Sequence, residues 1–299
     1  MLNTVIAPQP EFRYGLGGSP NPFREKFGEL THDQWRDLLI RSLDERIIED
    51  IEFPGYPEPE LQERIHGHSA EISIDEAYGF YCFVKNIPGV AAKLSRTARF
   101  LDFGAGWGRI SRLFLRDFDL SRMYGYEPYI GFCAVARVLN PYICFLNGDY
   151  LPDETLPPDR FDIVVGWSVF SHLSEHSATL WLAEMARVMR PEGHAVFTTW
   201  GERFLDRLIA SRADLEAGKD LDWYSRQCLA ASGDISERKA AYLRGDFVWF
   251  TGHDSTLYGE AFIHPDALRR LIEAHAIPLE LMAFDRHTLG QDAFVLRRR

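Results

Sequence analysis

The stretch LDFGAGWGRI, Leu101–Ile110, joins a short apolar run to three closely spaced glycines. The run ends near an acidic residue, Asp102, and the glycines are Gly104, Gly106 and Gly108. Glycine allows a tight turn and lets a ligand approach the backbone. A helix that begins here would also present unpaired N–H groups. The pattern therefore predicts a strand, a ligand-binding turn and a helix in succession.

Short apolar runs alternate with helical segments over residues 98–199. The runs are ARFLDF, RMYGYE, YICFLN, FDIVVGW and HAVFTTW, and each is continuous, as in strands buried on both faces. This alternation predicts an α/β fold whose parallel sheet carries helices on both faces. Near the C-terminus only DRHTLGQD separates LELMAF from AFVLRR, which is too short for a crossover, so we expect an antiparallel pair.

Apolar residues recur at helical spacing after the glycines. The opposite face of this expected helix carries Arg109, Arg112 and Arg116. We interpret these three arginines as a solvated helix face rather than a binding patch, because charged residues usually cover the outer face of a surface helix.

The remaining segments have a different character. Residues 1 to about 30 are rich in proline and glycine and are expected to form an extended arm, followed by two helical patterns. Residues 200 to about 255 are helical and aromatic-rich, and a final helix follows them. The expected divisions are an N-terminal arm and helical lid over 1–96, a cofactor-binding core over 97–199, an insertion and lid over 200–263, and a closing helix and strand pair over 264–299.

Composition limits the classes of partner. The 299 residues include 33 basic and 44 acidic side chains, for a net charge of −11, which disfavours a broad nucleic-acid surface. The four cysteines are scattered and suggest neither a disulfide framework nor a metal site. No signal peptide or membrane-spanning run is evident, so we expect a cytoplasmic protein.

Two classes of ligand fit the glycine-rich turn, namely dinucleotides and S-adenosylmethionine. The spacing is GxGxG, whereas a dinucleotide fingerprint has GxGxxG, and Arg109 stands at its last position. Asp102 would lie poorly beside a pyrophosphate but suits the cationic amino group of a methionine moiety. The terminal antiparallel pair is also not the usual ending of a dinucleotide-binding fold. Together these features favour S-adenosylmethionine.

Side chains at the ends of later strands suit the rest of this ligand. Glu127 ends the second strand and can accept hydrogen bonds from both ribose hydroxyls. Asp149 follows the third strand as a candidate acceptor for the adenine amino group, and Tyr150 or Leu151 could cover the ring. Trp167 and Ser168 end the fourth strand beside the reacting centre. The predicted cofactor-binding residues are therefore Asp102, Gly104, Ala105, Gly106, Gly108, Glu127, Asp149, Tyr150, Trp167 and Ser168.

Residues 98–199 resemble the core of the class I S-adenosylmethionine-dependent methyltransferases. The matching pieces are LDFGAGWGRI, YGYEP, NGDY, FDIVVGWSVFSHL and RVMRPEGHAVFTT, in the order and spacing of that family. The resemblance implies a Rossmann-like, mostly parallel sheet of seven strands with the last one antiparallel. It also implies S-adenosyl-L-methionine as cofactor. It does not extend to the N-terminal part or the insertion, where this family usually encodes the choice of acceptor.

Two histidines are candidates for a general base. His172 follows the fourth strand in SVFSHL, and a structural hydrogen bond to the local turn is its alternative role. His253 lies near the end of the insertion, in TGHDS. Aromatic residues of the insertion, such as Tyr224 and Tyr258, are expected in its core or in the wall of an acceptor pocket.

The sequence thus predicts a methyltransferase for a small-molecule or glycan acceptor. O-methylation is favoured, and the absence of metal-ligand spacing favours a metal-independent reaction. A non-catalytic cofactor-binding or scaffold protein of the same fold is an alternative, and a nicotinamide-dependent oxidoreductase is a further one. No nucleic acid or membrane partner is expected, and the oligomeric state is left open.

Overall fold

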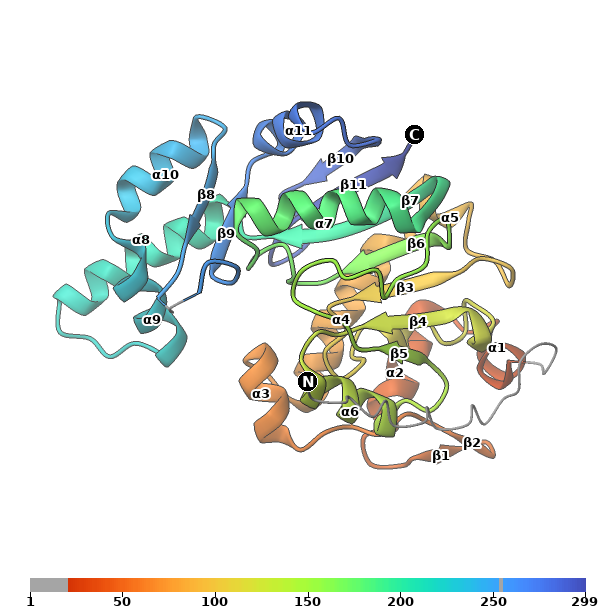
Figure 1. Ribbon diagram of the computed structural model, residues 1–299. Helices are drawn as coiled ribbons and strands as arrows, with labels where there is room; N and C mark the ends of the chain where they lie inside the picture. The colour runs from red at the N-terminus through yellow and green to blue at the C-terminus, as the bar shows by residue number, and fades with distance from the viewer. Residues whose placement is uncertain (1–20, 253–254) are drawn as a thin grey trace, which may run out of the picture. The chain divides into compact units, whose positions relative to one another are not determined.

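The computed structural model describes residues 21–252 and 255–299. These residues divide into two compact units. Figure 1 shows the chain coloured by residue number from the N-terminus to the C-terminus. The first unit contains the described residues up to Cys82 together with Leu94–Asn147. The second contains Phe83–Lys93 and Gly148–Arg299, without the two residues that are not described.

Three parallel strands form the centre of the first unit. They are β3 (Phe100–Phe103), β4 (Met123–Tyr126) and β5 (Cys144–Leu146). β4 lies between the other two, and all four residues of β3 are buried, as its continuous apolar run predicts. The other elements of this unit are α1 (Pro22–Phe27), α2 (His32–Arg41), β1 (Ile47–Ile48), β2 (Ile51–Glu52), α3 (Pro59–His66), α4 (Ala70–Lys85, which ends in the second unit), the 3-10 helices η1 (Ser111–Phe114) and η2 (Leu120–Arg122), and α6 (Ile130–Leu139).

The sequence predicts an extended arm up to about residue 30. This prediction is wrong for residues 22–27, which form α1, and residues 1–20 lie outside the described part of the chain. Asn21 begins this helix because its Oδ1 accepts a hydrogen bond from the backbone N–H of Phe23 at 3.0 Å. The Nδ2 of the same side chain donates to the carbonyl oxygens of Leu115 and Phe118. One asparagine therefore caps α1 and fixes it to the segment after the glycine-rich turn.

The three arginines after the glycines are buried, which corrects the prediction of a solvated helix face. Arg109, Arg112 and Arg116 expose 3%, 1% and 5% of their surfaces. The chain forms only the short η1 here, so regular helical spacing does not decide which side chains face solvent. N-terminal segments supply partners instead: Arg109 binds Glu76 of α4 at 2.6 Å, and Arg116 donates to the carbonyl oxygen of Leu30 at 2.7 Å.

Arg112 is the most enclosed of these arginines. Its guanidinium lies 4.2 Å from the ring centroid of Tyr56 and 4.4 Å from that of Trp107. It donates to the Gly55 carbonyl oxygen at 2.9 Å and to Asn140 Oδ1 at 3.1 Å. Burial lowers the pKa of the Arg112 guanidinium. This one cation therefore links the N-terminal region, the glycine-rich turn and the end of α6.

Four strands of the large sheet lie in the described part of the second unit. They are β6 (Phe161–Gly166), β7 (Met189–Thr199), β10 (Leu279–Asp285) and β11 (Asp292–Arg298). β6 and β7 pair in parallel, whereas β11 is antiparallel to both β7 and β10, which confirms the predicted terminal pair. The complete sheet has seven strands in the order β10-β11-β7-β6-β3-β4-β5, as the resemblance implies. The helices α5 (Pro88–Ala91), α7 (Glu175–Val188) and α11 (Pro265–Ala274) also belong to this unit.

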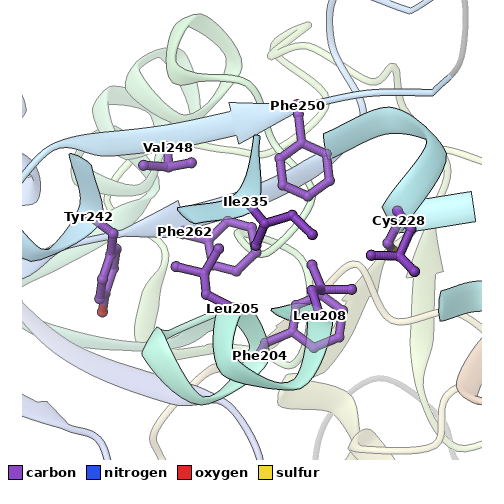
Figure 2. Packing of buried hydrophobic residues seen from close by; sticks show 10 residues of the cluster. Phe204, Leu205, Leu208, Cys228, Ile235, Tyr242, Val248, Phe250 and Phe262 are labelled. Carbon is purple, nitrogen blue, oxygen red and sulfur yellow. The ribbon is translucent and has the colours of Figure 1, made fainter. Parts of the chain in front are cut away.

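The insertion has its own apolar core. It contains α8 (Glu202–Glu216), α9 (Trp223–Ser232) and α10 (Ile235–Leu243), as its helical pattern predicts. It also contains the antiparallel pair β8 (Phe247–Phe250) and β9 (Glu260–Ile263), which was not predicted. Figure 2 shows Val248 and Phe250 of β8 pointing toward Phe204, Leu205 and Leu208 of α8. The strand pair therefore provides the surface on which these helices pack.

No helix within residues 21–252 and 255–299 combines the length and the apolar composition needed to cross a membrane.

We expect Arg112→Met to destabilise the protein by about 3 kcal/mol, because the Gly55 and Asn140 acceptors would lose their buried donor. Urea unfolding of the purified protein measures this change. The matched control is Arg96→Met, since the Arg96 side chain is 65% exposed and should contribute little. Equal stabilities of the two variants would contradict a structural role for Arg112.

Candidate functional site

The predicted glycine-rich turn lies at the carboxyl end of β3. The φ angles of Gly104, Gly106 and Gly108 are 71°, 54° and 87°, in the left-handed region that favours glycine. The backbone N–H groups of Gly104 and Ala105 both donate to the carbonyl oxygen of Tyr126, at 2.9 and 3.0 Å. The turn is therefore fixed to the end of the neighbouring strand β4.

Two of these glycines have different surroundings. A Cβ atom added to Gly108 would lie 2.7 Å from Asn140 Nδ2 and 2.9 Å from Phe145 Cζ, so close packing requires glycine there. A Cβ atom on Gly106 would meet no described atom within 4 Å. Gly106 is itself buried, but space that no described atom fills lies beside its Cα, and a ligand group could enter this space.

Glu127 follows β4 directly and holds the turn from the other side. Its Oε2 accepts a hydrogen bond from the N–H of Gly106 at 2.8 Å, and its Oε1 accepts one from the N–H of Tyr129 at 2.9 Å. Burial raises the pKa of this carboxyl group, and the two backbone N–H groups oppose the shift. Each carboxylate oxygen can accept a further hydrogen bond, which two adjacent hydroxyls could supply.

Asp102, in β3, is held through one oxygen only. Its Oδ2 accepts from the backbone N–H of Ser111 at 3.0 Å and from the Ser111 hydroxyl at 2.5 Å. Its Oδ1 accepts no hydrogen bond from residues 21–252 or 255–299. Burial raises the pKa of Asp102 to about 6, although the Ser111 hydrogen bonds oppose the shift. Oδ1 therefore keeps hydrogen-bonding capacity for the predicted ligand cation, although Asp102 exposes only 1% of its surface.

The other predicted cofactor-binding residues lie in the second unit. Asp149 accepts from the N–H of Tyr150 at 2.6 Å, in the loop after β5. Trp167 follows β6 and is 9% exposed. Ser168 has φ 58°, which is costly for a residue with a side chain. Its hydroxyl accepts a hydrogen bond from Gln291 Nε2 at 2.8 Å, and this contact fixes the strained residue.

His172 also lies in the second unit, and its side chain contacts a distant segment rather than the local turn. Nδ1 lies 2.9 Å from the carbonyl oxygen of Gly259. Because a carbonyl oxygen can only accept, Nδ1 carries the proton and the neutral ring keeps its lone pair on Nε2. The ring stacks on Tyr258 at 4.8 Å, and Nδ1 lies 3.6 Å from Glu260 Oε2. His253, the other base candidate, lies outside the described residues.

Glu260 and Trp200 were missed by sequence reasoning. Trp200 Nε1 donates to Glu260 Oε2 at 2.7 Å, and the Tyr224 hydroxyl donates to the same oxygen at 2.8 Å. The available signal was a lone acid within the apolar run GEAFI, where a strand would bury it.

The second unit also contains a cavity of about 780 Å³ bordered by α10, β8 and α11. None of the described predicted site residues lines this cavity. The described residues contain no group of three His, Cys, Asp or Glu side chains placed to hold a metal ion.

The raised pKa of Asp102 predicts a pH effect on stability. A buried carboxyl whose folded pKa is about 6 favours the folded state when protonated, so its contribution decreases as pH rises through 6. The free energy of unfolding of the wild type, relative to Asp102→Asn, should fall by about 1.4 kcal/mol between pH 5 and pH 7.5. Urea unfolding at both pH values measures this difference, and a constant or increasing difference would contradict the assignment.

Comparisons with known proteins identify the family and the fold of the chain. The family described as methyltransferase domain matches residues 76–273. No curated protein sequence matches the chain. An S-adenosylmethionine-dependent methyltransferase from Leishmania major is 14% identical over 89% of this chain and 83% of its own, with a TM-score of 0.51. CalS10, an amino pentose methyltransferase from Micromonospora echinaspora, is 18% identical over 82% of this chain and 98% of its own, with a TM-score of 0.49.

At these identities the solved structures show the fold alone. The family match, in contrast, spans well over half of the chain and includes the glycine-rich turn, Glu127 and His172. It confirms the resemblance to the class I S-adenosylmethionine-dependent methyltransferases, and we conclude that the protein belongs to the methyltransferase-domain family.

Proposed function

We propose that this protein uses S-adenosyl-L-methionine to methylate an oxygen atom of a small-molecule or sugar acceptor, without a metal ion. The observation that carries the proposal is the arrangement at the ends of β3 and β4. There Gly106, beside space that no described atom fills, donates its N–H to the carboxylate of Glu127, and Asp102 Oδ1 has no partner among the described residues. These groups match a ligand with vicinal hydroxyls and a cationic amino group.

The residues present fit this cofactor. Glu127 would accept hydrogen bonds from the ribose hydroxyls through its remaining lone pairs, and Asp102 Oδ1 would bind the amino group. The assignment of the adenine to Asp149 and Tyr150, and of Trp167 and Ser168 to the reacting centre, remains a prediction from the sequence. When bound, S-adenosyl-L-methionine supplies a sulfonium methyl group to an acceptor nucleophile.

His172 is the proposed base for a hydroxyl acceptor. Its Nδ1 is held by the Gly259 carbonyl oxygen, so Nε2 can take a proton from an acceptor hydroxyl as the methyl group is transferred. A base in this position removes the need for a metal ion to lower the pKa of the hydroxyl. The N-terminal helices and the insertion are the proposed lids that exclude water.

A non-catalytic cofactor-binding protein would share the Asp102 and Glu127 contacts but not the chemistry. Formation of S-adenosylhomocysteine in the presence of a panel of sugars and hydroxylated small molecules distinguishes the two. Cofactor binding without turnover across the whole panel would favour the non-catalytic alternative.

Removing the carboxylate of Glu127 should abolish strong cofactor binding. Glu127→Ala eliminates both proposed ribose contacts, and we expect its dissociation constant for S-adenosylhomocysteine to rise at least about 100-fold. Isothermal titration calorimetry measures the change. Glu45→Ala, on the exposed surface of the first unit, is the control and should bind as the wild type does. Unchanged affinity of the Glu127 variant would refute the proposed site.

The role of His172 is tested by Asn, whose side-chain amide can still donate to the Gly259 carbonyl oxygen but lacks Nε2. We expect His172→Asn to lower kcat about 100-fold, because a base is lost. Affinity for S-adenosylhomocysteine should be unchanged. His176→Asn, at an exposed position of α7, is the matched control. A His172→Asn variant with wild-type kcat would exclude His172 as the base.

A further inference from the structure

Glu260 is a partly buried carboxylate held by neutral donors. Its side chain is 13% exposed, and its Oε2 accepts hydrogen bonds from Trp200 Nε1 at 2.7 Å and from the Tyr224 hydroxyl at 2.8 Å. His172 Nδ1 approaches the same oxygen at 3.6 Å but has the Gly259 carbonyl oxygen as its closer acceptor. Every described polar neighbour of this carboxylate therefore contacts Oε2.

The second oxygen, Oε1, accepts no hydrogen bond from the described part of the chain. Oε1 is not fully enclosed either, so it reaches accessible space. Among the described lysine and arginine side chains, none lies within the 4.0 Å of Glu260 that defines an ion pair. A carboxylate removed from bulk water is normally paired with a cation, because burial of an isolated charge is costly. Within residues 21–252 and 255–299, Glu260 thus has no donor to Oε1 and no lysine or arginine as a counter-ion.

Two aromatic rings lie against His172, the neighbour of Glu260. The ring of Tyr258 stacks on His172 with an interplanar angle of 10° and is 48% exposed, while Trp200 meets His172 edge-on at 6.4 Å. Aromatic faces attract cations through their quadrupoles, and a carboxylate adds a direct ionic hydrogen bond. A neutral hydroxyl could bind Oε1 but would leave the charge of Glu260 uncompensated.

We propose that Glu260 Oε1 binds the ammonium group of the acceptor, with Tyr258 as its aromatic neighbour, so that the substrate is a small molecule carrying both a basic amine and a hydroxyl. This inference rests on the proposed methyltransferase function and narrows its substrate class. The amine orients the acceptor at Glu260, and the hydroxyl is the group that gives its proton to His172 Nε2. Since Glu260 and His172 lie side by side in the second unit, one compact amino alcohol or amino sugar can reach both.

The test uses two probes that have nearly the same shape but differ in charge, and a third that is a neutral polyol. Cyclohexylammonium and cyclohexanol are titrated into the full-length protein at pH 7.5, together with glucose as a neutral polyol, and binding is followed by saturation-transfer NMR. We expect cyclohexylammonium to bind at least about tenfold more tightly than either neutral probe. Equal binding of cyclohexanol, or preferential binding of glucose, would overturn the proposal in favour of a hydroxyl-binding site.

Two pairs of variants link this preference to the named residues. Glu260→Gln retains an acceptor for Trp200 and Tyr224 but removes the charge, and it should weaken cyclohexylammonium binding about 10- to 100-fold. Its control, Glu273→Gln on the exposed face of α11, should have no effect. Tyr258→Leu should weaken binding of the same probe, whereas Tyr258→Phe, which keeps the ring, should not.

Cofactor binding is measured on the same samples, so that failure of the inference can be told from failure of the proposed function. If Glu260→Gln binds S-adenosylhomocysteine as the wild type does but loses the amine, the inference is supported. If the wild type binds S-adenosylhomocysteine but shows no preference for the amine, the inference alone fails. If the wild type does not bind S-adenosylhomocysteine, the proposed function fails. Thermal unfolding of Glu260→Gln checks that the loss does not come from misfolding, and Tyr258→Leu supplies the second, independent readout.

Discussion

The hydrogen bond from the Gly106 N–H to the carboxylate of Glu127 joins the ends of two neighbouring strands and organises the first unit. It requires a backbone that turns back after β3, which only glycine adopts easily at φ 54°. It also requires a carboxylate at the first residue after β4. The Tyr126 carbonyl oxygen reinforces this junction by accepting from Gly104 and Ala105. The candidate site is therefore a direct consequence of how β3 and β4 end.

Buried arginines connect the segment after the glycine-rich turn to the N-terminal part of the chain. Arg112 contacts two aromatic rings and donates to both Gly55 and Asn140, and the same Asn140 donates to the carbonyl oxygen of Trp107 within the turn. A cation with several acceptors and aromatic contacts compensates much of the cost of its own burial. The N-terminal region thus provides partners for the segment after the glycine-rich turn, which the sequence analysis assigned to the core over 97–199 alone.

The sequence predicts best where a local rule leaves few choices. Continuous apolar runs identify β3, β6 and β7, and a connection too short for a crossover identifies the antiparallel β10 and β11. The prediction for the three arginines was wrong because it assumed a regular helix, whereas the chain forms the short η1 and tertiary partners decide burial. The roles of Trp200 and Glu260 could not be predicted, since their contact joins residues 60 positions apart and depends on the pairing of β8 with β9.

The carboxylates of Asp102 and Glu260 have the same pattern of hydrogen bonds, although their neighbours differ. In each carboxylate one oxygen accepts two hydrogen bonds, from the N–H and hydroxyl of Ser111 or from Trp200 and Tyr224. The other oxygen is left without a described donor. Fixing one oxygen orients the whole planar group, so the second oxygen points in a defined direction and little conformational entropy is lost when a ligand binds. If both oxygens were saturated, each carboxylate would have only a structural role. The oxygen without a described donor is what suits each of them to the ligand contacts proposed above.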